Sequence, residues 1–156
     1  NYPTWGLVET SSMDWSMFFS EHYRRPDARP RLRRLSIRPQ RFVSIHADYG
    51  GGECVTNPLI FRGRELHLNC STSAAGSVCV EVQDEQGHPL DGFALADADV
   101  FFGDALDAKM TWKGRSDLAS FVGRPVRFRL VLKDADVFAL QTVADTLEGS
   151  EGGARV

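Results

Sequence analysis

Residues 126–133 read VRFRLVLK, with an apolar side chain at every second position from Val126 to Leu132. Residues 65–70 (ELHLNC) and 78–83 (VCVEVQ) alternate in the same way. A period of two places successive side chains on opposite faces of a β-strand, whereas a helix repeats every three to four residues. Each segment is therefore expected to bury one face and expose the other, as in two antiparallel sheets packed together.

Shorter segments extend this pattern. Leu35 and Ile37 lie two positions apart, so they should point to the same face of a strand. Met110 and Trp112 are spaced in the same way, and Trp112 is therefore predicted to lie in the core with Met110. Glycine-rich turns separate the segments roughly every ten residues. The sequence thus predicts an all-β fold, an antiparallel two-sheet sandwich resembling a jelly roll, with about 8–10 strands.

One short helix is expected, over residues 116–122. Ser116 would cap it, Leu118 and Phe121 would face inward, and Gly123 would end it.

The chain has 156 residues, 42% of them hydrophobic and 25% charged, which suits one globular domain with a core. We expect a strand and linker segment at 1–26 that connects to a preceding domain, a sandwich at 27–147 and a flexible tail at 148–156. Asp14–Tyr23 is expected to form one strand, and the prolines that follow suggest a linker. The first residues include neither a Met nor a signal pattern, so we expect a chain cut from a longer protein.

No apolar run is long enough to cross a bilayer, so no membrane partner is expected. The compartment is left open, with an extracellular or periplasmic location favoured.

Three cysteines are too few for a disulfide framework. Cys54, Cys70 and Cys79 could form one disulfide bridge or remain three thiols. Cys70 lies at an apolar position of its strand pattern, which favours a packed thiol.

Arginines gather in one stretch. Residues 24–41 hold eight arginines against Asp27 alone, a charge of +7, which leaves −10 for the rest of the chain. Such a stripe could bind a polyanion, but the overall acidity opposes nucleic-acid binding. Leu35 and Ile37 are expected to face inward on their strand. Arg34 and Arg38 lie at the alternate positions, so their side chains should point outward. We expect them to pair with acids of this chain or of a neighbouring domain, with an anionic polysaccharide as the alternative ligand.

Several motifs from residue 31 to residue 141 resemble a known kind of domain. They are RRL at 33–35 followed by FVS at 42–44, LNCSTSAAG at 68–76 leading into VEV at 80–82, GHPLDGF at 87–93, GD at 103–104, WKG at 112–114, GRPVRF at 123–128 and DADVF at 134–138. Together they resemble the C-terminal β-sandwich of large bacterial, planctomycete-type proteins. In those proteins the sandwich follows a five-bladed propeller similar to furanosidase-type glycoside hydrolases.

The resemblance implies a sandwich that accompanies a catalytic propeller, with the catalytic carboxylates in the propeller. Residues 1–25 would then be the last propeller strands or the connection out of the propeller. One departure is Gln40-Arg41, where the family tends to have Asp-Gly before Phe-Val-Ser, which puts the local turn in doubt.

Glycosidic hydrolysis needs two carboxyl groups about 5–5.5 Å or about 6.5–9.5 Å apart. Glu81 and Glu85, four residues apart on a strand, would be separated by about 13 Å, which is too far. The pairs Asp97/Asp99 and Asp134/Asp136 would be about 6.6 Å apart, but both lie where turns favour Asp. No catalytic residue is therefore assigned.

Metal binding by histidine is not expected, because the four histidines form no chelating pair. No cofactor is required. Calcium is possible, because Asp97, Asp99, Asp104 and Asp107 crowd one connection and calcium accepts carboxylates without strict spacing.

Sugar binding needs an exposed ring beside hydrogen-bonding groups. Tyr49 follows that description, with His46, Asp48 and Glu53 as polar neighbours. Other aromatic residues, among them Trp5, Trp15 and Tyr23, could face a partner domain.

The sequence therefore favours a non-catalytic accessory sandwich of a glycoside-hydrolase-like protein that binds carbohydrate or supports the propeller. Two alternatives stay open: a free-standing glycosidase using one Asp pair, and a module that docks onto another protein.

Overall fold

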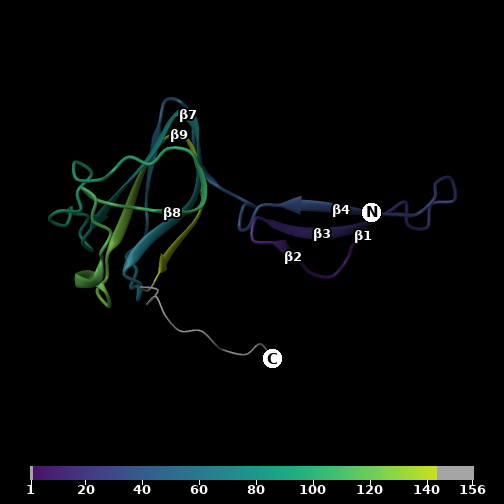
Figure 1. Ribbon diagram of the computed structural model, residues 1–156, viewed down its shortest axis with the longest axis horizontal. Coiled ribbons are helices and arrows are strands. Elements are labelled where there is room, and N and C mark those ends of the chain that lie inside the picture. Colours follow the sequence, from purple (N-terminus) through teal and green to yellow (C-terminus); the bar gives the residue numbers. More distant parts are fainter. Residues whose placement is uncertain (1, 144–156) are drawn as a thin grey trace. The chain divides into compact units, whose positions relative to one another are not determined.

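The computed structural model describes residues 2–143, so the predicted tail at 148–156 lies outside the described residues. Within that range the chain forms nine strands and one turn of 3-10 helix (Figure 1): β1 (Tyr2–Pro3), β2 (Val8–Ser11), β3 (Asp14–Glu21), β4 (Arg31–Ile37), β5 (Ile45–Ala47), β6 (Gly52–Val55), β7 (Glu65–Gln83), β8 (Asp104–Lys109), η1 (Ala119–Phe121) and β9 (Arg127–Val143). The strands make two antiparallel sheets, one of four strands and one of five. The prediction of an all-β, sandwich-like fold is confirmed.

The chain divides into two compact units, Asn1–Ser44 and Ile45–Val156. The predicted boundary near residue 26 falls between β3 and β4, which pair along their lengths from Trp15 opposite Ile37 to Glu21 opposite Arg31. The arginine-rich strand thus belongs with the first unit. The predicted strand at Asp14–Tyr23 is present as β3.

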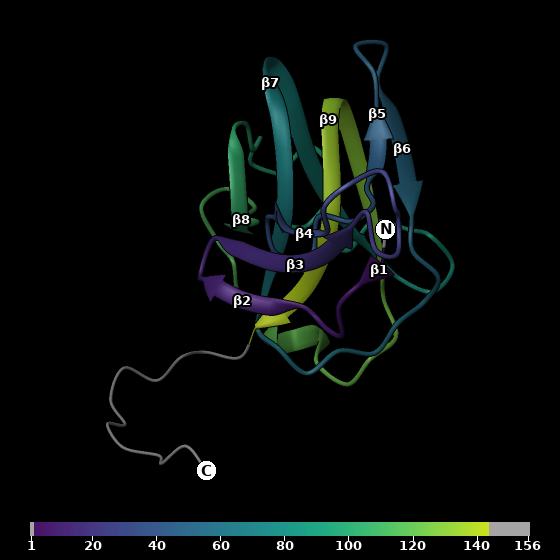
Figure 2. The ribbon, with the colours of Figure 1, turned by 90° about the vertical axis from the view of Figure 1, so that its right-hand side faces the viewer.

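The second unit is built on β7 and β9, which lie side by side (Figure 2). β8 pairs with the outer edge of β7, whereas β5 and β6 pair with successive parts of β9. Five strands thus form one sheet, and the sheet is strongly curled around its own core.

The pairing of β7 with β9 shifts register between Thr72 and Ser77. At this place Asp134 has a left-handed backbone, with φ of 42°. A Cβ atom on Gly76 would lie only 2.4 Å from the Asp134 carbonyl oxygen, so the close approach of the two strands requires glycine.

The alternating segments supply the core as expected. Leu66, Leu68 and Cys70 are buried, as are Val78, Val80, Val82, Phe128, Leu130 and Leu132. Cys70 is thus a packed thiol, and all three cysteines are free.

Trp112 is fully buried, which confirms its predicted place in the core. Its ring lies 5.1 Å from that of Phe93, which in turn lies 5.0 Å from Phe121. The indole Nε1 donates a hydrogen bond of 2.7 Å to the Val80 carbonyl oxygen, so the one polar atom of the buried ring is satisfied.

The expected helix is only the 3-10 turn η1. Leu118 and Phe121 are buried as predicted. Ser116 is not the cap: its hydroxyl donates to Glu65, and the Asp117 carboxylate accepts the Ala119 N–H at 2.8 Å.

The alternating polar residues of β7 are not all exposed, contrary to the simple pattern. His67, Asn69, Glu81 and Gln83 are buried. Glu81 and His67 have hydrogen-bond partners on other segments of the chain, among them Leu95 and Arg129 for Glu81 and Asp107 for His67.

The first unit is a single sheet centred on β3. β4 pairs with one edge of β3 along residues 15–21, so β1 and β2 share the opposite edge, at Tyr2–Pro3 and Val8–Ser11. Ser16 is the one buried residue among 2–44.

Trp112→Ala should lower the free energy of unfolding by about 3–5 kcal/mol, because it empties the centre of the aromatic cluster. Trp5→Ala is the matched control, since Trp5 is fully exposed, and it should change stability by less than about 0.5 kcal/mol. Denaturant unfolding of the whole chain measures both. A similar loss in the two variants would contradict the assignment of Trp112 to the core.

Candidate functional site

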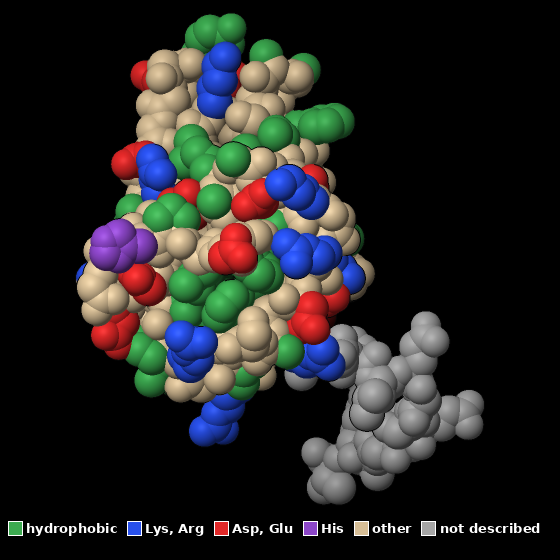
Figure 3. Space-filling model, turned by 90° about the vertical axis from the view of Figure 1, so that its left-hand side faces the viewer, with side chains coloured by type: hydrophobic (Ala, Val, Ile, Leu, Met, Phe, Trp, Pro, Cys, Tyr) green, Lys and Arg blue, Asp and Glu red, His purple; other side chains and the backbone are tan. Residues whose placement is uncertain are grey.

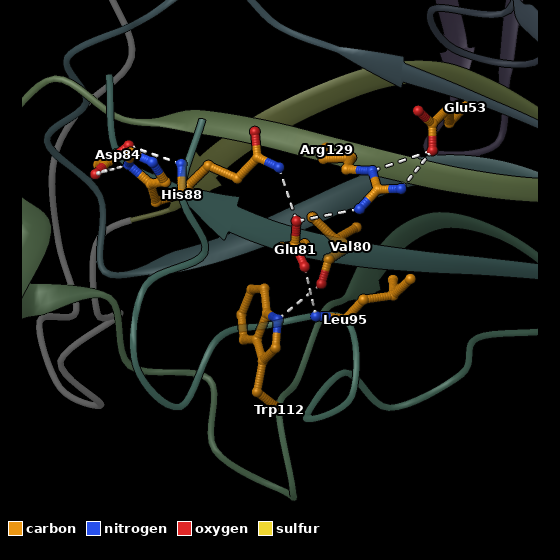
Figure 4. Close-up of polar contacts among 9 residues, drawn as sticks. Glu53, Val80, Glu81, Asp84, His88, Leu95, Trp112 and Arg129 are labelled. Atoms are coloured by element: carbon orange, nitrogen blue, oxygen red, sulfur yellow. Dashed lines mark hydrogen bonds and ion pairs between the residues drawn. The ribbon is translucent and has the colours of Figure 1, made fainter. Parts of the chain in front are cut away.

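The most buried charged network lies on the outer face of β7 and β9 (Figure 4). Glu81 Oε1 accepts a hydrogen bond from Gln83 Nε2 at 2.7 Å, and Oε2 accepts the Leu95 N–H at 2.8 Å. Arg129, directly opposite on β9, reaches Glu81 Oε1 at 3.4 Å. Its Nε and Nη2 donate to Glu53 Oε2 at 3.1 and 2.6 Å.

Burial alone would raise the pKa of Glu81, but the bonds from Gln83, Leu95 and Arg129 outweigh it and lower that pKa. Glu53 and Glu81 together raise the pKa of Arg129. Among the described residues, every buried side-chain nitrogen or oxygen has a partner. An acid catalyst needs a raised pKa and access to substrate. Glu81 has neither, so this network is structural.

A second cluster surrounds His67, whose ring is buried. Nδ1 lies 2.6 Å from Asp107 Oδ1, and Nε2 lies 3.1 Å from Glu65 Oε2. Asp107 also accepts a hydrogen bond from Gln141 Nε2. The cluster joins β7, β8 and β9, and sequence alternation alone had placed His67 on a solvent-facing side.

Glu65 holds the other end of this cluster. Its Oε1 accepts bonds from Lys109 Nζ at 2.9 Å and from the Ser116 hydroxyl at 3.0 Å. The bond from Lys109, followed by that from His67, lowers the pKa of Glu65 to about 2. Glu65 thus stays ionised and acts as an acceptor.

The predicted sugar-binding residues gather around the turn between β5 and β6. Tyr49 is 65% exposed, but the Lys133 ammonium lies 4.3 Å from the centroid of its ring. His46 contacts Asp136 at 3.1 Å, and Asp48 accepts the Gly50 N–H at 2.8 Å.

Glu53, the fourth predicted residue, bonds to Arg129. Tyr49, His46 and Asp48 thus lie at or beside the turn between β5 and β6, and the polar groups of His46 and Asp48 contact other groups of the protein. A cation covers one side of the ring where a sugar would stack, so the arrangement offers limited support for a sugar platform.

The proposed calcium ligands are not brought together. Asp97 forms an ion pair with Lys113. Asp99 accepts hydrogen bonds from the Thr111 hydroxyl and the Gly114 N–H. Asp107 is hydrogen-bonded to His67. Asp104 begins β8, opposite Ser71. Within the described part of the chain, no group of three or more His, Cys, Asp or Glu side chains is placed to hold a metal ion.

Three of the four carboxyl groups in the candidate catalytic pairs contact other side chains of the protein. Bonds from Lys113 to Asp97 and from Thr111 to Asp99 lower the pKa of each carboxyl group. Asp136 contacts His46, and Asp134 occupies the left-handed bend of β9.

Charges of both signs are mixed over the face drawn in Figure 3, with hydrophobic side chains between them.

Arg34 donates to the hydroxyls of Ser16 at 2.8 Å and Thr10 at 3.2 Å. Arg38 also has a partner within the protein. Leu35 was predicted to face a core, yet it is 49% exposed. Residues 2–44 supply no second layer of strands that would cover Leu35 on this side of the sheet.

The two faces of the first sheet follow from the register of β3 and β4. We call one the Trp15 face: Trp15, Met17, Phe19, Glu21, Arg31, Arg33, Leu35 and Ile37. We call the other the Arg34 face: Ser16, Phe18, Ser20, Leu32, Arg34 and Ser36, with Tyr2 and Val8 on the neighbouring strands. Both carry large apolar side chains that sequence patterns could not distinguish from core residues.

Comparisons with known proteins found no family model, no curated protein and no solved structure that matches this chain. Within residues 2–143, no helix has the length and apolar character needed to span a membrane.

Glu81→Ala should cost about 3–5 kcal/mol of unfolding free energy, because it leaves the Gln83 amide and the Leu95 N–H without their acceptor and removes one of the two carboxylates that contact Arg129. Glu53→Ala removes the other, exposed carboxylate from the same arginine and should cost about 0–1 kcal/mol. Chemical denaturation compares the two variants. Equal costs would show that burial does not distinguish the two carboxylates.

Glu65 should make folding sensitive to acid. Its pKa is about 2 in the folded protein against 4.5 in the unfolded chain, so its stabilising effect is complete above pH 4.5 and is lost as the pH falls toward 2. Glu65→Gln should therefore be less stable than the parent at neutral pH, and the difference should shrink through that window. Melting curves across the pH range measure this effect. Glu85→Gln, at an exposed position with the same change of charge, should leave the pH profile unchanged; an unaltered profile for Glu65→Gln would refute the role of Glu65.

Proposed function

We propose that this chain is a non-catalytic accessory module of a larger, glycoside-hydrolase-like protein, and that residues 2–44 attach it to a partner surface. The curled sheet of the second unit serves as the stable body. The glycoside-hydrolase context comes from the sequence motifs between residues 31 and 141. Its expected partner is a neighbouring domain of the same parent protein.

One observation carries the docking role: the first unit is one sheet with large apolar side chains exposed on both faces. The exposed residues in this unit include Tyr2, Trp5, Leu7, Val8, Leu32, Leu35, Phe42 and Val43. A sheet must bury an apolar face against another layer to be stable, and a few strands alone are marginal in water. Exposed apolar surface of this kind marks an interaction site.

The chemistry of the second unit favours a non-catalytic role. Its candidate acids accept hydrogen bonds, and the pKa values of Glu65, Glu81, Asp97 and Asp99 are lowered. Glycoside hydrolysis instead needs one carboxyl group that keeps its proton. Carbohydrate binding at Tyr49 remains part of the proposal, with the free side of the ring as the contact surface.

Hydrogen exchange on the dilute isolated chain tests the docking role. Amides of β3 and β4 should exchange much faster than those in the centres of β7 and β9, because residues 2–44 supply one sheet and no second layer of strands over it. Equal protection in both sheets would show that residues 2–44 need no partner.

Assays on polysaccharides and aryl glycosides test the non-catalytic role. We expect no turnover from the purified chain. Hydrolysis that is abolished by Asp97→Asn or Asp134→Asn, but retained in Glu85→Gln, would establish the glycosidase alternative instead.

A further inference from the structure

We infer that the outer edge of β4 is a strand-addition site, which pairs backbone to backbone with an extended, acidic segment of the partner domain. This inference rests on the proposed docking role of residues 2–44, and it names the part of the first unit that holds the partner and the chemistry of the segment that is held.

The direction of the peptide groups in β4 follows from its neighbour. β4 lies at one edge of the first sheet and pairs with β3 (Figure 1). The Thr4 N–H donates to the Phe18 carbonyl oxygen at 2.8 Å, so the peptide groups of Phe18 point away from β4. Successive residues of a strand point these groups to opposite edges, so the odd-numbered residues of β3 bond to the odd-numbered residues of β4. The N–H and C=O groups of Leu32, Arg34 and Ser36 therefore point out of the sheet.

No described segment covers this edge. Among residues 2–143, no strand or loop forms a backbone hydrogen bond with Leu32, Arg34 or Ser36. Residues 31–36 are all exposed. Three donors and three acceptors thus repeat at intervals of about 6.6 Å, and an extended chain has peptide groups at the same spacing.

The side chains of β4 determine the charge that such a chain should carry. Glu21 accepts bonds from Arg31 at 2.5 Å and from Arg33 at 2.7 Å, so one carboxylate serves two guanidinium groups. On the opposite face of the sheet, the Arg34 guanidinium has two hydroxyl groups as its partners and no carboxylate among the described residues. Positive charge is thus in excess on both faces of this edge. Carboxylates placed directly opposite these arginines would stabilise an added strand.

The same charges oppose pairing of β4 with a second copy of itself. If two β4 strands paired antiparallel over their full length, Arg34 would lie opposite its counterpart, and like charges in that position are destabilising. Charged side chains commonly protect edge strands from such self-pairing. The arginines of β4 therefore oppose an identical strand and favour an acidic one.

The other side chains of β4 favour apolar residues in the added strand. Leu35 and Ile37 belong to the Trp15 face, and Leu32 belongs to the Arg34 face. The best partner segment thus places apolar residues opposite these three positions and acids opposite the arginines. Each apolar pair across the two strands would extend an apolar surface that the sheet already exposes.

The edges of the second sheet are less suited to strand addition. The turn at residues 48–51 separates β5 from β6, so that edge is interrupted. At the other edge, the register of β8 with β7 shifts between Leu68 and Cys70. Interrupted and bulged strands are poor templates for a further strand. β4, by contrast, keeps one register with β3 along all seven of its residues.

A capped peptide, Val-Thr-Val-Glu-Glu-Val-Glu, serves as the probe. In antiparallel register with β4, its glutamates lie opposite the three arginines and its valines opposite the three apolar residues. Titration into the full chain at low salt, followed by NMR, should show saturable binding. Amide exchange should slow at Leu32, Arg34 and Ser36, whereas Arg33 and Leu35, which already bond to β3, should change little.

Two control peptides separate backbone pairing from charge. Lysine in place of each glutamate keeps the strand pattern and should weaken binding about tenfold or more. Methylation of the peptide N–H groups that face β4 keeps the carboxylates but removes the donors, and it should also weaken binding about tenfold or more.

Arg34→Glu should reverse the preference, so that the lysine peptide binds more tightly than the glutamate peptide. Arg124→Glu is the matched control, because it makes the same change of charge at an exposed position of the second unit; it should bind like the parent. The peptide series uses the parent chain alone, so a misfolded Arg34 variant would leave that test intact.

Absence of binding by the glutamate peptide, equal binding of its methylated form, or protection that appears only at β5, β6 or β8 would overturn the inference. Exchange in the peptide-free chain tests the docking role separately. Fast exchange of β3 and β4 would leave that role standing without strand addition, whereas protection equal to that of β7 and β9 would remove it as well.

Discussion

Strands β7 and β9 run antiparallel from Glu65 opposite Val143 to Gln83 opposite Arg127. Every other strand of the second unit pairs with one of these two. Their long pairing bends where Gly76 passes the Asp134 carbonyl oxygen, and the bend allows one sheet to curl around its own core. The core, the position of Trp112 against Val80 and the polar clusters on the outer face all depend on this pairing.

The fold class and much of the core could be predicted from the sequence, because alternation is a local property. Leu66, Leu68 and Cys70 followed the phase read from their own segment, and so did Trp112. The polar clusters could not be predicted in this way. Glu81 is covered through Leu95 and Arg129, and His67 through Asp107, so each depends on contacts between distant segments.

The candidate site shows the same limit. Tyr49, His46 and Asp48 are close in sequence, and their proximity could be foreseen. The Lys133 ammonium over the Tyr49 ring comes from β9, and no local pattern indicates it. In the first unit, Pro26 and Pro30 suggested a linker, but they lie in the connection between two paired strands. Proline content cannot distinguish a linker from a connection within a sheet.

The three tryptophans are divided between the two units: Trp5 and Trp15 lie in the first and Trp112 in the second. Indole emission depends on solvent contact, and Trp112 is enclosed while Trp5 is fully exposed. Intrinsic tryptophan fluorescence can therefore report on the two units separately. Emission from the enclosed indole follows the integrity of the curled sheet, whereas emission from the other two follows what covers the first sheet. Quenching by a small solute would separate these signals without any added dye.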